Sequence, residues 1–410
     1  MTQTAPSATA AVFSREQRRA LTVLGISQTL GGAGMVAGIT VGALLAQDLL
    51  GSTGLAGLPA ALYTIGAAFG AAVLGRVSQR FGRRPGLALG NGIAALGSAG
   101  VVAGAAARWP VLLLSALCVY GAGTVTGLLA RYAGTDLAPP RRRGRAAGTV
   151  LFAMTLGAVV GPNLTGPTGD LADAWSLPRL TGPFLLATVA YGAAALVLVV
   201  WLRPAPLPPA PPREPGTSRT GALRTGRPAP GVITGATVMI TAQLVMIAVM
   251  TMTPVHMAGH GHTTQAVGLV IALHVGAMFL PSPLSGLLAD RIGGRRVAVA
   301  AGAVLLGAGL LAGLAPPTSA PLLACALVLL GVGWNLALLG GTAVLTDAAP
   351  AENRAALQGL ADVGMSVAGA TGGMVSGLVT SSGGYPVLAV AAGALALAVI
   401  PAVATSSGST

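Results

Sequence analysis

Long apolar windows occupy most of the chain, and nearly all charged residues lie between them. Each window is close to the roughly 20 apolar residues that a helix needs to cross a bilayer. The apolar runs are unbroken, unlike the alternating segments of about ten residues that form membrane β-barrels. We therefore predict twelve transmembrane helices, at residues 20–46, 54–76, 86–107, 111–133, 146–168, 180–202, 231–256, 264–288, 297–314, 320–345, 355–380 and 385–405.

The composition strengthens the membrane interpretation. Hydrophobic residues make up 53% of the chain and charged residues 8%, whereas a soluble domain usually carries about 25% charged residues. Small residues let membrane helices approach closely, so the 61 glycines fit membrane helices better than soluble ones. The expected fold class is an all-α integral membrane protein.

The basic residues are distributed unevenly over the predicted loops. All 23 are arginines, and when the loops are numbered alternately, all except Arg108 and Arg179 fall on one side. An excess of arginine marks the cytoplasmic side of a membrane protein, so both termini are predicted to be cytoplasmic, in a plasma (inner) membrane. Topology thus accounts for the net charge of +13, and no nucleic-acid partner is expected.

A proline- and arginine-rich stretch at residues 203–229 divides the chain into six-span halves, residues 20–202 and 230–405. We predict a cytoplasmic linker there, because the stretch is too polar to form a core, and cytoplasmic ends at 1–19 and 406–410. A shift of 211 residues aligns the halves without a gap. It places Gly75, Arg80, Gly82 and Arg84 on Gly286, Arg291, Gly293 and Arg295, and Asp136, Arg143 and Gly148 on Asp347, Arg354 and Gly359. The chain is therefore an internal duplication of two pseudo-symmetric six-helix bundles, an arrangement found in alternating-access transporters.

The loops after the second and eighth predicted spans carry a repeated motif. The second copy has Gly286, Asp290, Arg291, Gly293 and Arg295 at the positions of G-x-x-x-D-R-x-G-R-R/K. This signature and the 6 + 6 plan resemble the major facilitator superfamily of secondary transporters over essentially the whole chain. The resemblance implies a latch that locks one conformation. The latch candidates are Gly75, Arg80, Gly82, Arg84, Arg131, Asp136, Gly286, Asp290, Arg291, Gly293, Arg295, Asp347 and Arg354.

Two positions qualify the predicted latch. Gln79 stands where the family usually has aspartate, so the first copy lacks the carboxylate of an ionic latch. Arg131 lies near the predicted cytoplasmic end of the fourth span, and we expect it to form an inner gate or helix-end pair with Asp136.

The fifth predicted span is similar to the family's antiporter signature, which is associated with exporters. The glycines permit close helix packing and the proline permits bending. Thr165 replaces one of the paired glycines that end the signature, and Leu117 stands where drug:proton antiporters usually have an arginine. The resemblance to the twelve-span drug:proton antiporter branch rests on Gly148, Gly157, Gly161, Pro162 and Gly166.

Ionisable side chains inside the predicted spans are few, because burying charge in a membrane is costly. Asp362 lies about two turns into the eleventh span, and His274 lies near the middle of the eighth. A carboxyl group or an imidazole held away from water can exchange a proton near neutral pH. We therefore predict Asp362 and His274 as proton-coupling residues, with a hydrogen-bonded core histidine and a water-facing aspartate as the alternatives.

Several uncharged polar side chains within the spans can line a substrate cavity or hydrogen-bond a neighbouring helix. They are Gln28, Tyr63, Asn91, Gln243 and Asn335. In the resembling family the first, fourth, seventh and tenth spans usually line the cavity, which favours Gln28, Gln243 and Asn335.

All four histidines lie within nineteen positions, at His256, His260, His262 and His274. Imidazoles suit borderline transition metals, so these histidines either bind a metal or belong to a solvated loop. If they bind a metal, a metal-ion or small-metabolite carrier is the alternative function. No resident metal or cofactor is expected. A P-loop is missing, which argues against an ATP-driven pump, and we do not expect an enzyme.

The sequence therefore predicts an alternating-access transporter that works as a monomer. The most favoured activity is proton-coupled efflux of a small amphiphilic compound or drug. A non-transporting membrane receptor is the third alternative.

Overall fold

The computed structural model describes residues 16–35, 58–136, 138–202, 229–397 and 399. Several predictions fall on the undescribed residues. They concern residues 1–15 of the N-terminal segment, 203–228 of the linker, the tail at 406–410, and parts of the first, second and twelfth spans (36–46, 54–57, 398 and 400–405). The helices are a first helix at 16–35, α2 (Leu58–Phe81), α3 (Arg83–Ala106), α4 (Pro110–Thr124), α5 (Thr126–Asp136), α6 (Arg143–Asn163), α7 (Thr165–Ala174), α8 (Gly182–Trp201), α9 (Pro230–Gly259), α10 (Thr264–Phe279), α11 (Ser282–Ile292), α12 (Gly294–Leu314), α13 (Ala320–Ala348) and α14 (Arg354–Ala396), with short 3₁₀ helices η2 (Pro140–Arg142) and η3 (Arg179–Thr181).

The helical membrane fold is confirmed. Within the described residues, ten helical segments are long and apolar enough to span a membrane. One of them, α14, contains the eleventh predicted span and the start of the twelfth, divided at Gly384, whose φ of 81° and ψ of 168° are not helical. A glycine tolerates this conformation because it has no Cβ.

Some span boundaries differ from the prediction. The fourth span is divided between α4 and α5, and the eighth between α10 and α11, where Pro281 and Pro283 interrupt the helix. Proline removes a backbone donor and disfavours a continuous helix. The fifth span starts earlier than predicted, and α7 carries it on to Ala174.

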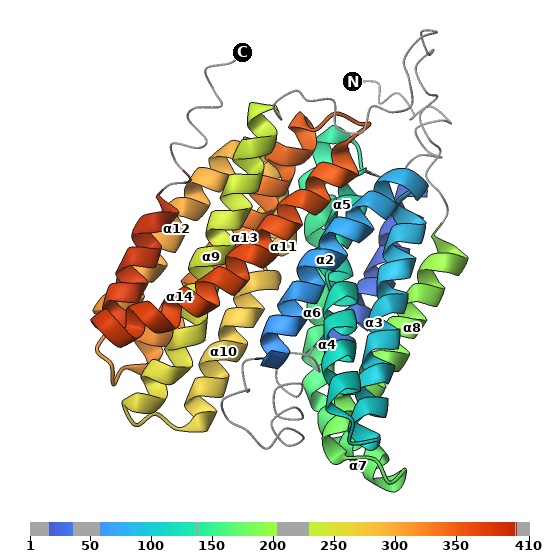
Figure 1. The fold of residues 1–410 in the computed structure, drawn as a ribbon. Coiled ribbons are helices and arrows are strands. Elements are labelled where there is room, and N and C mark those ends of the chain that lie inside the picture. Colours follow the sequence, from blue (N-terminus) through green and yellow to red (C-terminus); the bar gives the residue numbers. More distant parts are fainter. Residues whose placement is uncertain (1–15, 36–57, 137, 203–228, 398, 400–410) are drawn as a thin grey trace, which may run out of the picture.

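The helices form two bundles of roughly parallel rods (Figure 1). One bundle holds α2 to α8 and the other holds α9 to α14. The halves pack against each other mainly where α2 contacts α14 and where α6 contacts α11.

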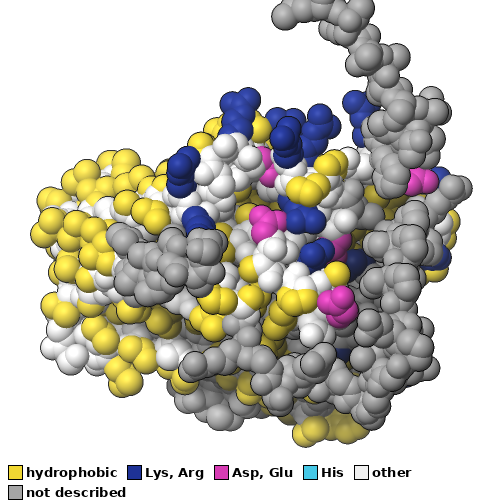
Figure 2. Space-filling model, turned by 90° about the horizontal axis from the view of Figure 1, so that it is seen from above, with side chains coloured by type: hydrophobic (Ala, Val, Ile, Leu, Met, Phe, Trp, Pro, Cys, Tyr) yellow, Lys and Arg dark blue, Asp and Glu magenta, His cyan; other side chains and the backbone are white. Residues whose placement is uncertain are grey.

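One end of the molecule, called here the arginine-rich face, gathers most of the described arginines (Figure 2). It contains the end of α2, the start of α3, η2, the end of α11 and the starts of α12 and α14. Gly82 and Gly293 make the α2–α3 and α11–α12 turns on this face with φ of 95° and 89°. Both motif glycines therefore have a positive φ, which a residue without a Cβ tolerates.

Candidate functional site

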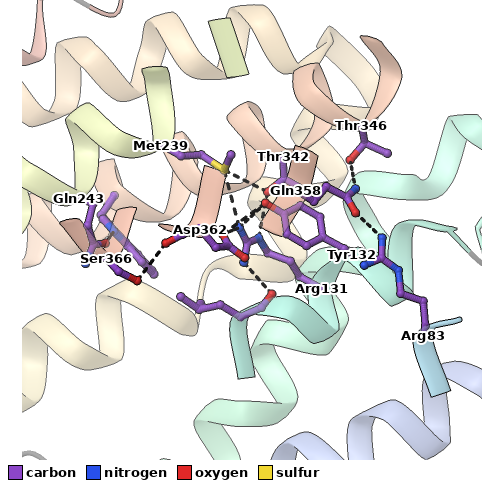
Figure 3. Close-up of polar contacts among 12 residues, drawn as sticks. Arg83, Arg131, Tyr132, Met239, Gln243, Thr342, Thr346, Gln358, Asp362 and Ser366 are labelled. Atoms are coloured by element: carbon purple, nitrogen blue, oxygen red, sulfur yellow. Dashed lines mark hydrogen bonds and ion pairs between the residues drawn. The ribbon is translucent and has the colours of Figure 1, made fainter. Parts of the chain in front are cut away.

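An ion pair between Arg131 and Asp362 joins the two halves inside the bundle (Figure 3). Arg131 belongs to α5 and Asp362 to α14, and their Nη2 and Oδ1 atoms are 2.7 Å apart. The relative exposures of the two side chains are 0% and 1%. A buried charge is tolerated when it is paired and hydrogen-bonded, so each half supplies the charge that makes the other half's charge tolerable.

Further polar groups surround the Arg131 guanidinium. Its Nη1 donates to the backbone oxygen of Leu128 over 2.6 Å, and its Nε donates to Thr342 Oγ1 over 3.1 Å. Its Nη2 also donates to the Tyr132 hydroxyl over 2.7 Å, and Met239 Sδ lies 3.8 Å away. Arginine keeps its charge at every physiological pH, so the guanidinium is a permanent cation within a nearly complete set of acceptors.

Asp362 is less fully satisfied than Arg131. Its Oδ1 accepts from Arg131 and lies 3.4 Å from the Tyr132 hydroxyl. Its Oδ2 is buried and has no hydrogen-bond partner among the described residues. Because no donor binds this oxygen, a proton can bind it without breaking a hydrogen bond.

A second layer of contacts connects the buried pair to the arginine-rich face. Gln358, one turn before Asp362 on α14, accepts from Arg83 and donates to Thr346 Oγ1 over 3.1 Å. Arg83 Nε also pairs with Asp136 Oδ2 at 2.7 Å. Arg83, Gln358 and Thr346 therefore link α3, α14 and α13 immediately outside the pair (Figure 3).

The expected pair between Arg131 and Asp136 is wrong. Residues five apart in a helix do not lie on one face, since neighbours on a helix surface are three or four apart. Arg131 faces the other half and Asp136 faces Arg83. Arg131 is also fully buried rather than at the helix end.

Two matching contacts, called here the latches after their predicted role, join the halves at the arginine-rich face. Asp290, at the end of α11, accepts from the backbone N–H groups of Gly144 and Arg145 over 2.7 and 2.8 Å, at the start of α6. Its counterpart Gln79 accepts from the N–H groups of Ala355 and Ala356 over 2.8 and 3.4 Å, at the start of α14. The free N–H groups of a helix N-terminus favour such acceptors. The 211-residue shift places the acceptor and both N–H donors of one latch on those of the other. Gln79 therefore makes the same contact as Asp290 without the negative charge.

The remaining latch candidates lie around these contacts. Arg143 pairs with Asp347 at 2.8 Å across the halves, whereas Arg354 donates to Ala349 O nearby in the chain. Arg80 lies over the ring of Phe81, and Arg84 donates to Val199 O within its own half. Arg295 lines a surface pocket of the arginine-rich face, and Arg291 lies at the end of α11 on the same face.

Glycines let the two halves touch at their backbones. A Cβ built on Gly148 would collide with Ser282 O, and a Cβ built on Gly359 would lie 2.8 Å from Ala71 O. These two contacts are again related by the 211-residue shift. A Cβ built on Gly157 would likewise collide with Thr29 O of the first helix. Among the described residues, no atom beyond the backbone of its own helix turn lies within 4 Å of a Cβ built on Gly166. Gly161 and Pro162 belong to α6 near its end.

His274 does not join Asp362 in one site. It is fully buried between α10 and α13, where Nδ1 contacts Leu327 O over 2.7 Å. Its Nε2 has no partner among the described residues. The two predicted coupling residues therefore occupy separate surroundings, and Asp362 alone lies at the junction of the halves.

The cavity candidates separate into helix-packing and accessible groups. Gln28 and Asn91 are buried, donating to Gly127 O and Leu87 O, and both line one small cavity of the N-terminal half. Asn335 donates to Met278 O and Ser282 Oγ at the break between α10 and α11. Tyr63 and Gln243 are partly exposed; Tyr63 accepts from Thr124 and Gln243 accepts from Trp334 Nε1.

The histidine-rich turn lies at the other end of the C-terminal half. His260 Nδ1 contacts His256 O over 2.8 Å, and His262 Nε2 contacts Pro317 O over 2.9 Å. The described residues contain no group of three or more His, Cys, Asp or Glu side chains that could hold a metal ion.

Sequence reasoning missed Tyr132, Met239, Thr342 and Gln358, all of which contact the buried pair or its outer layer. Thr342 carried a usable signal, because it is the counterpart of Arg131 under the 211-residue shift. Residues related by a twofold axis and close to it lie opposite each other, and Arg131 does donate to Thr342.

Comparison with known proteins agrees with this architecture. The family model of the Major Facilitator Superfamily matches residues 23–336 and 234–406. The chain is 48% identical over 395 residues to the uncharacterized MFS-type transporter YddS of Bacillus subtilis, covering 94% of this chain and 90% of that protein. It is 32% identical over 354 residues to the riboflavin transporter RfnT of Brucella anthropi, covering 84% and 85%.

Solved structures share the fold. The E. coli fucose:proton symporter FucP superposes with a TM-score of 0.75 at 13% identity, over 94% of this chain and 98% of that one. A bacterial homologue of the iron transporter ferroportin, in an outward-facing state, gives a TM-score of 0.74 at 14% identity, over 95% and 99%. With the helical membrane fold, the duplicated halves and these relatives, the chain belongs to the major facilitator superfamily and is a multi-pass membrane transporter, not an enzyme.

Proposed function

We propose that the protein is a proton-coupled exporter of a small amphiphilic organic molecule in the bacterial plasma membrane, with Asp362 as the proton carrier. The arginine-rich face lies in the cytoplasm in this proposal, as the positive-inside rule predicts. The single observation that carries it is the buried Arg131–Asp362 pair, which joins the halves and leaves one carboxylate oxygen free.

The contacts between the halves support an outward-open state. The latches at Asp290 and Gln79, the Arg143–Asp347 pair and the Arg131–Asp362 pair all lie on the arginine-rich side of the bundle. Asp362 lies eight residues beyond Arg354, about 12 Å deeper along the helix at 1.5 Å per residue. The buried pair is therefore the innermost of these ionic contacts, behind the latches.

Protonation of Asp362 removes the attraction that closes this side. Breaking a buried ion pair by neutralising one partner costs about 3–5 kcal/mol. Moving a two-state equilibrium from 1:99 to 99:1 takes about 5.5 kcal/mol. One proton on Asp362 thus supplies most of the free energy needed to shift the population from the outward-open to the inward-open state.

The direction of coupling follows from which state holds the pair. A proton entering from outside neutralises Asp362, and the halves open toward the cytoplasm. Release of the proton into the cytoplasm restores the carboxylate, and the pair re-forms with Arg131. If substrate binds only to the deprotonated protein, it leaves outward as the proton moves inward, which is antiport. The glycine pattern of α6 supports the same direction by resemblance.

Gln243 is the proposed substrate contact. Its Oε1 accepts the indole N–H of Trp334 over 2.7 Å, and because an indole is a donor only, the amide NH₂ of Gln243 faces away from Trp334. Gln243 lies one turn beyond Met239, on the side of the buried pair away from the arginine-rich face, and is partly exposed (Figure 3). An accessible donor within a membrane span fits a substrate that carries a carbonyl-type acceptor.

The test uses vesicles reconstituted with the full chain. Cells overexpressing the protein are first grown with a panel of toxic organic compounds and metal salts to obtain a substrate. In vesicles, an inward proton gradient should drive transport by the wild type, whereas Asp362→Asn should lose gradient-driven transport and keep substrate exchange. Asp290→Asn is the matched control for coupling: it removes a carboxylate outside the buried pair, so transport should still depend on the proton gradient even though its rate changes. Full proton coupling in Asp362→Asn would refute the proposal.

A second substitution tests the substrate contact. Gln243→Glu keeps an acceptor for Trp334 and replaces the amide donor by another acceptor. It should weaken substrate binding by about tenfold or more, since losing one buried hydrogen-bond partner costs about 1–3 kcal/mol. Proton coupling per transported molecule should not change. Unaltered affinity would remove Gln243 from the substrate site and leave the role of Asp362 standing.

The relationship to RfnT favours a second candidate, a carrier of riboflavin or a similar metabolite. Riboflavin therefore belongs in the substrate panel. Two measurements decide the direction: riboflavin uptake by whole cells and riboflavin export by the purified protein in vesicles. Uptake by cells without export in vesicles would support import and contradict the export direction proposed above.

A further inference from the structure

The end of α9 opposite the arginine-rich face carries two histidines one turn apart. His256 and His260 occupy positions i and i+4, and their ring centroids are 4.4 Å apart. His256 lies in the last turn of α9 and His260 directly follows the helix. Two imidazoles at i and i+4 are a recognised chelating pair for a divalent ion. Both rings are accessible, with His256 partly exposed and His260 exposed.

Hydrogen bonding gives His260 the tautomer that a metal requires. Its Nδ1 lies 2.8 Å from the backbone oxygen of His256. A carbonyl accepts only, so Nδ1 carries the proton and Nε2 of the neutral ring keeps its lone pair. Metal-binding histidines commonly show this arrangement, in which one nitrogen donates to a carbonyl and the other binds the ion.

Packing holds the other ring in place. His256 stacks on Tyr385 with a centroid distance of 4.4 Å and an interplanar angle of 16°. The Tyr385 hydroxyl lies 2.9 Å from Thr253 Oγ1, which fixes the stack from the other side. His262 in the same turn differs, because its Nε2 contacts Pro317 O and its ring belongs to neither stack.

From these contacts we infer that His256 and His260 form a surface site for a borderline divalent transition metal such as Cu²⁺, Ni²⁺ or Zn²⁺. The two imidazoles supply two nitrogen ligands and water completes the coordination sphere. The site lies where the end of α9 meets the part of α14 that follows Gly384. A bound ion would therefore hold the end of α9 beside Tyr385. This inference does not depend on the transported substrate.

The test measures Cu²⁺ binding by the full-length protein, purified without a histidine tag in detergent. Electron paramagnetic resonance during the titration should show one equivalent bound with nitrogen ligation. His256→Asn and His260→Asn should each weaken binding by more than the roughly tenfold that an outer-shell substitution already costs. His262→Asn is the matched control and should bind Cu²⁺ like the wild type.

The outcomes separate a built site from general affinity of the turn. Equal weakening in all three variants would mean adventitious binding by any nearby imidazole, and wild-type binding in His260→Asn would mean no chelating pair; either overturns the inference. Thermal unfolding of each variant checks folding. If His256→Asn is unstable because it loses the Tyr385 stack, the exposed His260→Asn still decides the question.

Discussion

The two halves are equivalent at their latches and unequal at their centre. Gln79 and Asp290 occupy matching positions and hold matching helix N-termini, although one is neutral and the other charged. About two turns further in, the same symmetry places Arg131 opposite Thr342, and Leu151 at the position that corresponds to Asp362. In the mechanism that we propose, the shared contacts build the closed state, and the unshared charges allow that state to sense a proton.

The largest effect is expected where the halves differ most. Arg131→Met or Asp362→Asn should each destabilise the protein by about 3–5 kcal/mol, because each leaves a buried polar partner uncompensated. The double variant Arg131→Met/Asp362→Leu should recover most of that stability, since a buried pair can often be replaced by packed apolar side chains. Denaturant unfolding in detergent measures all three.

Transport separates stability from coupling in the same variants. The double variant should be stable yet show no dependence of transport on the proton gradient. If each single variant is as stable as the wild type, the pair does not stabilise the closed state. The claim that the unshared charges distinguish the centre from the latches would then be wrong.

Intermediate effects are expected where the halves touch at their backbones. Gly75→Ala would place a Cβ 2.9 Å from Gly359 Cα, and Gly286→Ala would drive one into the backbone oxygen of Gly144. Overpacking of this kind costs about 1–3 kcal/mol and should open the arginine-rich face, more strongly at Gly286. Gly92→Ala is the control, because no neighbouring atom in the described part of the chain lies within 4 Å of its Cβ position.

The opening can be followed by chemical labelling. Thr346→Cys, introduced after Cys118 and Cys325 are replaced by Ser, puts a thiol at a fully buried position behind the latches. It should react faster with a membrane-impermeant maleimide in inside-out vesicles when Gly286→Ala is also present. Equal rates with Gly286→Ala and Gly92→Ala would show that this close approach does not hold the halves together.

The smallest effect is expected from the latch charges themselves. A hydrogen bond to a charged group is worth about 1.5–3 kcal/mol and a neutral one about 0.5–1.5 kcal/mol, so Asp290→Asn should cost about 1 kcal/mol per bond. Gln79→Glu should be nearly neutral: it adds a charge at a helix N-terminus and loses the hydrogen bond that Gln79 donates to Glu352 O. Substrate choice should not change in either variant. Unchanged transport rates in Asp290→Asn at normal expression would remove its latch role.

The sequence predicted the helical membrane fold and the duplication because both depend on patterns that repeat along the chain. It could not show that the fourth and eighth spans are divided, since the apolar windows continue across Thr124 and Phe279. The windows record burial in lipid and carry little information about local helix breaks.

The sequence indicated the two residues of the candidate site but not their pairing. Arg131 and Asp362 stood out as ionisable residues in or near spans, but their pairing crosses 231 positions and depends on how the halves meet. Asp136 looked like the natural partner because it is close in sequence, although helical geometry turns it toward Arg83. Tyr132 and Gln358 carried no signal, since only the packed structure places them beside the pair.

Amide hydrogen exchange tests the central claim most directly. The claim is that a neutral Asp362 releases both latches, so Asp362→Asn is compared with the wild type at one pH by mass spectrometry. Protected amides report closed structure, and the peptides of interest contain Gly144 and Arg145, or Ala355 and Ala356. The account predicts that both peptides lose protection together in Asp362→Asn while the interior of α3 stays protected. Unchanged protection at both latches, in a folded protein, would contradict it.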